Sequence, residues 1–220
     1  MLINPFMVAP ARPAIPASTK ILMPLTTADG FADIANNHAI TVIGSPTIST
    51  AQSKFGAGSL RVSIISSGNY LRINSTSTLD MSGKKPFTFE FWVYLTSGHY
   101  NGSSILSTRG DTASCTNILV KRNFTLIGDA YLDNWSGVGA AIPLNQWVHV
   151  ALVLDGTNIK EYINGVQTGS PSAHPSWPVG DKFLNVGYDF DGTIDGYIND
   201  LRISDYAVYT ANFTPPTSPF

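Results

Sequence analysis

Residues Gln146–Gly169 alternate between apolar runs and turn residues in a pattern typical of consecutive antiparallel strands. The run Trp147–Leu154 is apolar at nearly every position, which predicts a strand buried on both faces. After a polar turn, a second strand is predicted over Ile159–Ile163. Asn164-Gly165 then predicts a tight turn into a third strand, because both central residues of a type I′ turn need positive φ.

A long strand is also predicted over Phe87–Leu95, where two sets of side chains alternate strictly. One face would carry Phe87, Phe89, Phe91, Val93 and Leu95, and the other Thr88, Glu90, Trp92 and Tyr94. Such a strand belongs in the centre of a sheet, with its apolar face toward a core.

Shorter apolar segments follow one another along the chain, with turn residues about every 8–12 positions. We expect strands over residues 21–25, 38–43, 46–48, 59–65, 70–73, 105–107, 117–121, 124–127, 129–132, 183–187 and 197–203. Two hairpins are predicted, around Gly44-Ser45 and around Ser66–Asn69, and one helical turn over Asp205–Thr210. The predicted fold class is all-β, an antiparallel β-sandwich.

Proline-rich segments flank the predicted sandwich. Residues 1–19 are predicted to form an extended arm, residues 20–213 the sandwich, and residues 214–220 an extended tail. The arm lacks the basic and apolar regions of a secretory signal. The arm is either a disordered tail or packs on its own sandwich or on a neighbouring subunit. The arm residues proposed for such a contact are Pro5, Phe6, Pro10, Arg12 and Pro13.

Composition narrows the classes of partner. Charged residues make up 13% of the chain and the net charge is −2. Lys and Arg form no cluster, which argues against nucleic-acid binding. No apolar run reaches the roughly 18 residues of a membrane span. Cys115 is the single cysteine, so the chain has no internal disulfide and no cysteine metal cluster.

Several motifs together resemble a known family. They are Ser53–Leu60, Tyr70-Leu71, Phe87–Val93, Trp147–Ala151, Tyr162–Gly165 and Gly196–Ile203. In this order they resemble the laminin-G-like branch of the concanavalin-A-like lectin/glucanase jelly rolls. The ending Tyr206–Pro216 is similar to the ending of bacteriophage virion proteins that carry this domain. The resemblance implies jelly-roll topology for the sandwich.

From that ending and the arm, we expect a non-enzymatic accessory virion protein of a bacteriophage, with capsid decoration as the first hypothesis. It would be made in the host cytoplasm and would assemble with other virion proteins or as a homo-oligomer. The alternative is a lectin-like module that binds carbohydrate, on a tail fibre or against host glycans.

Enzymatic activity is not expected. A glycosidase needs two carboxylates about 5–10 Å apart across the sugar. The two glutamates of the chain, Glu90 and Glu161, are isolated within separate apolar strands. No Gly-x-Ser-x-Gly motif marks a serine nucleophile.

Calcium is the one cofactor that the resemblance implies. Many laminin-G-like domains hold one calcium ion near the strand ends, and the resemblance implies Asp29, Asp33 and Asp200 as its ligands. The alternative is that these acids only form turns. The family's last strand often carries two consecutive Asp residues, and the first of them is Asn199 here.

Sugar binding is predicted at loops where aromatic residues stand beside amides and carboxylates, because rings pack on sugar C–H surfaces. The candidates are Tyr100, Asp133, Asn134, Trp135 and Trp177. The alternative is that these rings cap the sandwich or bury against a neighbouring subunit.

Three further residue types are predicted to be structural. Trp92 and Trp147 are expected in the core or between the sheets. His149 is expected to be partly buried with its hydrogen bonds satisfied, and Arg202 to pair with Asp200.

Overall fold

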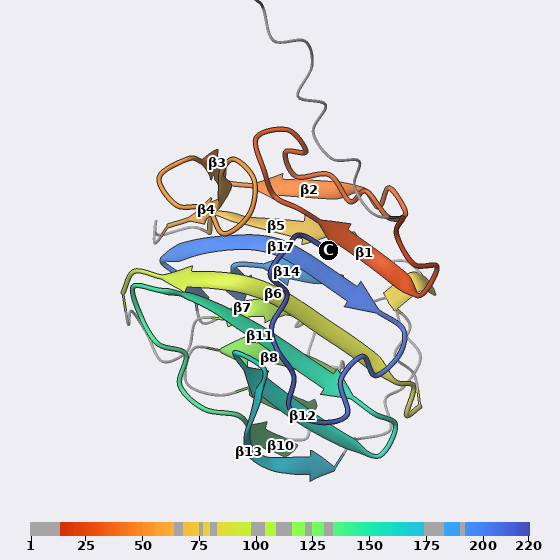
Figure 1. Ribbon diagram of the computed structural model, residues 1–220. Coiled ribbons are helices and arrows are strands. Elements are labelled where there is room, and N and C mark those ends of the chain that lie inside the picture. Colours follow the sequence, from red (N-terminus) through yellow and green to blue (C-terminus); the bar gives the residue numbers. More distant parts are fainter. Residues whose placement is uncertain are drawn as a thin grey trace, which may run out of the picture.

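The structure is a computed structural model that describes residues 14–63, 68–74, 77–79, 83–97, 104–108, 116–121, 125–129, 134–173, 183–189 and 192–220. Within these residues the strands form an eight-stranded sheet, a seven-stranded sheet and a two-stranded ribbon (Figure 1). All strand pairings in the sheets are antiparallel, so the predicted all-β sandwich is confirmed. No helix in the described part is long and apolar enough to span a membrane.

The larger sheet has the order β13-β12-β11-β6-β17-β4-β3, and β1 also pairs with β17. Its strands are β1 (Thr19–Met23), β3 (Thr47–Ser49), β4 (Ser59–Val62), β6 (Phe87–Leu95), β11 (Trp147–Leu154), β12 (Asn158–Ile163), β13 (Val166–Ala173) and β17 (Gly196–Ser204).

The smaller sheet has the order β10-β9-β8-β7-β14-β5-β2. Its strands are β2 (Ile40–Ile43), β5 (Tyr70–Ile73), β7 (Ser104–Ser107), β8 (Thr116–Lys121), β9 (Thr125–Asp129), β10 (Asn134–Val138) and β14 (Leu184–Val186). The ribbon consists of β15 (Tyr188–Asp189) and β16 (Gly192–Thr193), and a single 3-10 turn, η1, covers Ser77–Leu79.

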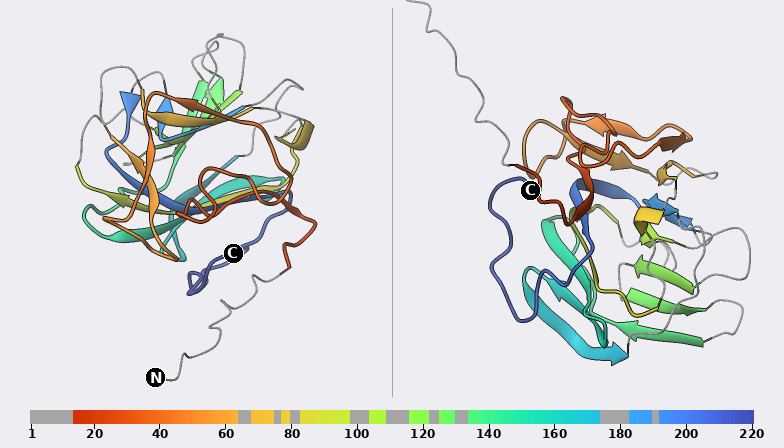
Figure 2. Two further views of the ribbon diagram at one scale, coloured as in Figure 1. Left: turned by 90° about the horizontal axis from the view of Figure 1, so that it is seen from above. Right: turned by 90° about the vertical axis from the view of Figure 1, so that its right-hand side faces the viewer.

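The two sheets face each other across one apolar core, as both views in Figure 2 show. From the larger sheet, alternate residues of β6 and β11 point into this core, including Phe89, Phe91, Val148 and Val150. Because side chains alternate along a strand, the residues between them lie on the opposite, outer face of the larger sheet.

The two strongest sequence patterns are confirmed. β6 and β11 have the predicted bounds and lie side by side in the centre of the larger sheet. The hairpin after β12 turns at Asn164 and Gly165, whose φ angles are 49° and 77°. These are the left-handed conformations that the Asn-Gly pair predicts.

Both predicted hairpins in the first third of the chain are wrong. β2 pairs with β5 in the smaller sheet, whereas β3 pairs with β4 in the larger one. The intervening turn is directed by Asn69, whose side-chain oxygen accepts a hydrogen bond from the Ser45 N–H (2.7 Å). β4 and β5 also lie in different sheets, so residues 63–69 connect the two layers.

One smaller prediction is wrong, and another is untested. Of the strand predicted over residues 129–132, only Asp129 is described, as the last residue of β9, and the rest lies outside the described residues. The segment Asp205–Thr210 contains no helical turn. Instead, Thr88 Oγ1 on β6 donates to the Tyr206 carbonyl (2.8 Å) and accepts from the Val208 N–H (2.9 Å), and this tertiary contact outweighs the weak local preference.

Candidate functional site

The outer face of the larger sheet carries most of the unusual chemistry of the molecule. On β6 this face presents Thr88, Glu90, Trp92 and Tyr94, since Phe89, Phe91 and Val93 point into the core. The C-terminal segment, residues 205–220, crosses this face on the side away from the smaller sheet (Figures 1 and 2). Part of the face is therefore buried although no second sheet covers it.

A buried ionic cluster lies beneath the C-terminal segment. The Arg202 guanidinium donates to Glu90 Oε1 through Nε (2.9 Å) and Nη2 (2.7 Å). The Tyr209 hydroxyl donates to Glu90 Oε2 (2.7 Å). His149 Nε2 lies 3.4 Å from the same oxygen, and both the Glu90 and the His149 side chains are 0% exposed. Arg202 faces Glu90 because the strand register places the two residues directly opposite each other.

Aromatic rings from the C-terminal segment close the cluster. Tyr209 and Phe213 stack with ring centroids 3.5 Å apart, and Phe213 also packs on Tyr162 (5.5 Å) and His149 (5.7 Å). The Arg202 guanidinium carbon lies 3.9 Å from the centre of the Phe220 ring. Backbone contacts add to this packing, since the Phe213 N–H donates to the Gly165 carbonyl (2.9 Å).

The electrostatics of this cluster are those of a structural ion pair. Burial raises the pKa of Glu90, but contacts with His149, Arg202 and Tyr209 outweigh it, and the net pKa lies below the usual 4.5. Glu90 is therefore a covered carboxylate that stays ionised. Burial and the adjacent Glu90 charge raise the pKa of the Tyr209 hydroxyl, which stays protonated.

The second glutamate is placed where it cannot act with Glu90. Across the strands, Glu90 pairs with Ala151, whereas Glu161 pairs with Leu152, the next residue along β11. Successive residues of a strand point to opposite faces, so the two carboxylates lie on opposite sides of the larger sheet.

Beyond the C-terminal segment, the outer face carries a row of half-buried rings. Trp147 on β11, Tyr94 on β6, Tyr197 on β17 and Arg61 on β4 occupy neighbouring cross-strand positions, and we call these four residues the aromatic row. The Tyr94 ring centroid is 5.8 Å from that of Trp147 and 6.0 Å from that of Tyr197. The Arg61 guanidinium carbon lies 5.1 Å from the centre of the Tyr197 ring.

A charged pair holds the end of the aromatic row. Arg61 Nη2 donates to Asp195 Oδ1 (2.6 Å), and the side chains are 26% and 22% exposed. Ser97 Oγ also contacts Asp195, at 3.4 Å. Burial raises the pKa of Asp195, but hydrogen bonds from Arg61, Thr96 and Ser97 outweigh it, so the net pKa is lowered. The row thus combines apolar rings with an ionised, solvent-accessible carboxylate and guanidinium.

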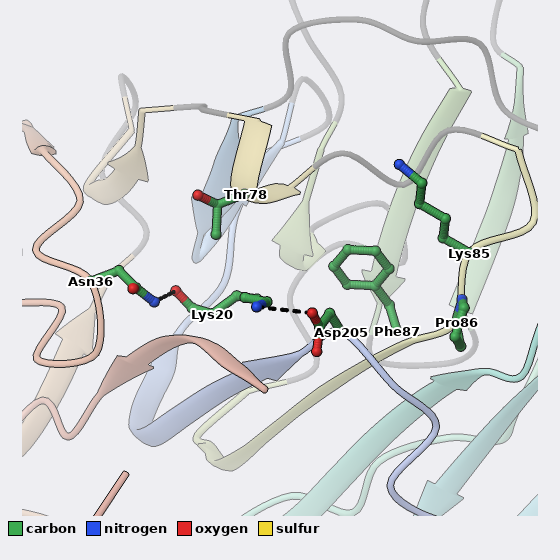
Figure 3. Close-up of a pocket in the computed structure, with 7 residues that line it drawn as sticks. All are labelled: Lys20, Asn36, Thr78, Lys85, Pro86, Phe87 and Asp205. Atoms are coloured by element: carbon green, nitrogen blue, oxygen red, sulfur yellow. Dashed lines mark hydrogen bonds and ion pairs between the residues drawn. The ribbon is translucent and has the colours of Figure 1, made fainter. Parts of the chain in front are cut away.

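A cleft of about 490 Å³ opens at the other end of β6 (Figure 3). It is lined by Lys20, Asn36, Thr78, Lys85, Pro86, Phe87 and Asp205. Lys20 Nζ lies 2.9 Å from Asp205 Oδ2, and the Asn36 side-chain amide donates to the Lys20 carbonyl (2.8 Å). The ion pair ties β1 to the end of β17, and the Asn36 hydrogen bond ties β1 to the segment that follows it, so much of the polar lining joins parts of the fold to each other.

The sugar-binding residues predicted from the sequence are not tested by the described structure. Asn134 and Trp135 begin strand β10 rather than lying in a loop, and their side chains are outside the described part. Tyr100, Asp133 and Trp177 also lie outside the described residues. The same holds for the predicted arm contacts Pro5, Phe6, Pro10, Arg12 and Pro13.

The three predicted calcium ligands do not form one site. Asp29 and Asp200 line the same pocket of about 220 Å³. The buried Asp33 carboxylate instead accepts hydrogen bonds from the N–H groups of Leu22 (2.9 Å) and His38 (3.2 Å), among others. In the described part, no three His, Cys, Asp or Glu side chains are grouped so that they could hold a metal ion. The acids therefore do not fit a shared calcium site.

Several structural roles differ from those predicted. Trp92 is buried, as predicted, but on the outer face of the larger sheet and not between the sheets, and Lys54 Nζ lies 3.8 Å from the centre of its ring. Trp147 lies on the same face and is half-buried. His149 is fully buried, and neither ring nitrogen makes a hydrogen bond within the described structure. Arg202 pairs with Glu90 rather than Asp200, because a bulge separates Asn199 from Arg202 and Asp200 has a φ of 56°.

The sequence did not single out the aromatic row. Its members come from four strands that are distant in the chain, and each follows or precedes a core residue. The one signal in the sequence was the alternation of side chains along each strand, which places Tyr94, Trp147 and Tyr197 on the face opposite their apolar neighbours. This alternation does not show which strands are neighbours, so it could not show that the three rings lie side by side.

Comparison with known proteins adds the family. No match was found among curated proteins. Among solved structures, the chain is similar to domain 4 of AbnA, a GH43 extracellular arabinanase from Geobacillus stearothermophilus, in complex with arabinotriose. The identity is 17%, the TM-score 0.64, and 87% of this chain and 94% of that chain are covered.

Two toxin binding domains are also similar. For the binding domain of botulinum neurotoxin serotype D the identity is 14%, the TM-score 0.66, and 88% of this chain and 49% of that chain are covered. For the binding domain of Paraclostridial Mosquitocidal Protein 1 the identity is 10%, the TM-score 0.69, and 87% of this chain and 50% of that chain are covered. The chain thus spans about half of each toxin binding domain, and these likenesses show the fold alone.

The decisive match is to a family model. The model described as the concanavalin A-like lectin/glucanases superfamily matches residues 66–212, which is two thirds of the chain. The matched range includes β6, β11, β12 and β17, the strands that carry the core, the buried cluster and most of the aromatic row. The chain belongs to the concanavalin A-like lectin/glucanase superfamily.

Proposed function

We propose that this chain is a non-catalytic carbohydrate-binding module and that the aromatic row is its binding surface. One observation carries the proposal: three aromatic side chains, Trp147, Tyr94 and Tyr197, lie side by side on the outer face of a sheet and are only half-buried. Large rings are usually buried, so a contiguous group of them that remains accessible to solvent indicates a binding surface.

The chemistry of the row suits a sugar chain. Ring faces and edges offer apolar contact for sugar C–H groups, while Arg61 and Asp195 offer a donor and an acceptor for hydroxyls. Four neighbouring strands span about 15 Å, since strands lie about 4.8 Å apart. This length accommodates an oligosaccharide lying across the strands rather than a single sugar.

Structural neighbours support the same class of ligand. The arabinanase domain was solved with arabinotriose, and the entry of botulinum neurotoxin type C into cells depends on an interaction with two ganglioside molecules. The similar structures from botulinum neurotoxin serotype D and from Paraclostridial Mosquitocidal Protein 1 are binding domains, which fits a module that binds and does not cleave.

The absence of catalysis is part of the proposal and rests on the glutamates. Glu90 is covered, ionised and held by Arg202 and Tyr209, and Glu161 lies on the other face of the sheet. A glycosidase pair needs two carboxylates on one side of a cleft, about 5–10 Å apart. We expect bound oligosaccharides to be recovered intact after prolonged incubation, as measured by release of reducing ends.

Replacing Trp147 by alanine is expected to weaken binding to the best glycan on a glycan array roughly thirtyfold, about 2 kcal/mol, the typical effect of losing a large aromatic contact. Tyr206→Ala is the matched control, because Tyr206 is an exposed aromatic outside the row. Titration calorimetry measures both. Equal binding by wild type and Trp147→Ala, with Tm unchanged, would contradict the assignment of the row.

A finer role follows from the C-terminal sequence. We propose that the module is an accessory protein of a bacteriophage particle, with head decoration as the first hypothesis, and that its N-terminal arm anchors it there. The support is the likeness of Tyr206–Pro216 to virion protein endings and the proline-rich composition of residues 1–19. Deleting residues 1–13 should abolish incorporation into particles, and normal incorporation would refute the anchoring role.

A further inference from the structure

Strand β2 forms an open edge of the smaller sheet. It is the terminal strand in the order β10-β9-β8-β7-β14-β5-β2, and it pairs only with β5 among the described strands. Figure 1 shows it at the rim of the molecule, beside β5. An edge strand offers a row of backbone groups with which another strand can pair.

The direction of these backbone groups follows from one hydrogen bond. The Asn74 N–H donates to the Ala39 carbonyl (3.0 Å), which makes Ala39 and Asn74 a hydrogen-bonded pair. In an antiparallel ladder such pairs alternate, so Thr41 and Ile43 also bond toward β5. The N–H and C=O groups of Ile40 and Val42 therefore point away from the sheet.

The edge has none of the features that usually prevent pairing. From Ala39 to Gln52 the sequence contains no charged residue. All four residues of β2 are β-branched, and none is proline. Val42 lies on the core side of the sheet, opposite Leu71, yet 47% of it is exposed. Natural edge strands are commonly protected by charges, prolines or bulges.

The other sheet edges are less suited to pairing. β13 contains Gly169 and Pro171 and has a register shift against β12, and it also contacts β10 at the edge of the smaller sheet. β3 is three residues long and pairs with β4. Among the described edges, β2 is the one that is regular, uncharged and apolar.

We infer that β2 pairs with β2 of a second copy of this chain, antiparallel and about a two-fold axis at Thr41. In that register Ile40 lies opposite Val42 of the other copy, and the outward groups of both residues form four backbone hydrogen bonds. In this register the side chains of Ile40 and Val42 from both copies lie on the core side of the joined sheet, so each exposed Val42 is covered by apolar side chains of the other copy.

A second copy fits this edge better than an unrelated partner of opposite charge. The edge carries no charge, so a homotypic contact meets no electrostatic repulsion. The symmetric register also preserves side-chain parity, which a contact shifted by one residue would not. The contact is small compared with interfaces of stable complexes, so the dimer is expected to be weak, with Kd on the order of 100 µM.

Light scattering after size exclusion, repeated over a range of concentrations, tests the pairing. The mass of the wild-type protein should rise from 23.6 kDa toward twice that value. Val42→Lys should keep the protein monomeric and raise the dimer Kd at least about tenfold, because it places like charges across the axis. Val166→Lys, at an exposed apolar position on β13, is the matched control and should dimerise like wild type.

A second variant guards against misfolding. Val42→Pro removes an outward N–H that the protein's own ladder does not use, so circular dichroism should be unchanged while dimerisation is lost. A wild-type protein that remains monomeric at about 1 mM would overturn the inference. Dimerisation that survives both Val42→Lys and Val42→Pro would overturn it as well, by showing that the copies meet elsewhere.

Discussion

Replacing Arg202 by methionine is expected to lower the free energy of unfolding by about 3–5 kcal/mol, the cost of leaving a buried charge without its partner. The carboxylate of Glu90 is fully buried, and Arg202 supplies two of its hydrogen bonds, at 2.9 and 2.7 Å. Methionine retains much of the apolar stem but neither the charge nor the donors. Urea denaturation at neutral pH measures the loss.

The stability loss caused by Arg202→Met is expected to depend on pH in a defined direction. The pKa of Glu90 lies below its usual 4.5 in the folded protein, so its ionic contribution is complete above pH 4.5 and is lost as the pH falls below that value. The difference in stability between wild type and Arg202→Met should therefore shrink below pH 4.5, because a protonated Glu90 no longer needs a counter-charge.

A double variant separates charge from packing. Glu90→Met combined with Arg202→Met removes both charges at similar volume, and we expect it to recover at least half of the lost stability. If the double variant were as unstable as Arg202→Met alone at neutral pH, the loss would come from packing, and the ionic account of the cluster would be wrong.

Replacing the three rings of the C-terminal segment by alanine should destabilise the protein by about 6 kcal/mol, roughly 2 kcal/mol for each half-buried ring. The positions are Tyr209, Phe213 and Phe220, which contact His149, Tyr162 and Arg202. This loss is comparable with the whole stability of a small domain. We expect a lower Tm and increased binding of a hydrophobic dye.

The same segment provides a control for that variant. Tyr206, Thr210 and Thr217 are exposed, and their triple replacement by alanine should change stability by less than about 1 kcal/mol. Similar losses for the two triple variants would mean that the segment stabilises the sheet through its backbone and not through its rings.

The fold was predictable where one strand's pattern decides the outcome. Phe87–Leu95 and Trp147–Leu154 were predicted with the observed bounds, because strict alternation and a continuous apolar run are strong local signals. The continuous apolar run of Trp147–Leu154 does not arise because both faces of the strand pack between sheets. Ala151 and Val153 are apolar because the C-terminal segment covers the outer face there.

Features that depend on which distant strands pair, such as the connections between the sheets and the partner of Arg202, were not predictable from the sequence. The segments around Gly44-Ser45 and residues 63–69 have the composition of hairpin turns, yet both carry the chain from one sheet to the other. Arg202 was assigned to Asp200 by proximity in sequence, while the register placed it opposite Glu90. Turn chemistry and neighbouring charges are local signals, and pairing between distant strands is not.

The aromatic row shows the same limit for function. Nothing in the sequence of each separate strand marks its members, which are Arg61, Tyr94, Trp147 and Tyr197, as part of a binding site. Sugar binding is predicted at the loop aromatics because they stand next to amides and carboxylates in the sequence. The aromatic row can be recognised only when the strand order β11-β6-β17-β4 is known, because this order brings its residues together.

The central claim is that glycans bind the outer face at the aromatic row. Its most direct test is to titrate the best glycan from the array into isotope-labelled protein and to follow chemical shifts by NMR. We predict that the shifts concentrate at Tyr94, Trp147, Tyr197 and the Arg61–Asp195 pair. Shifts confined to the cleft of Lys20 and Lys85, or to residues remote from the row, would contradict the claim.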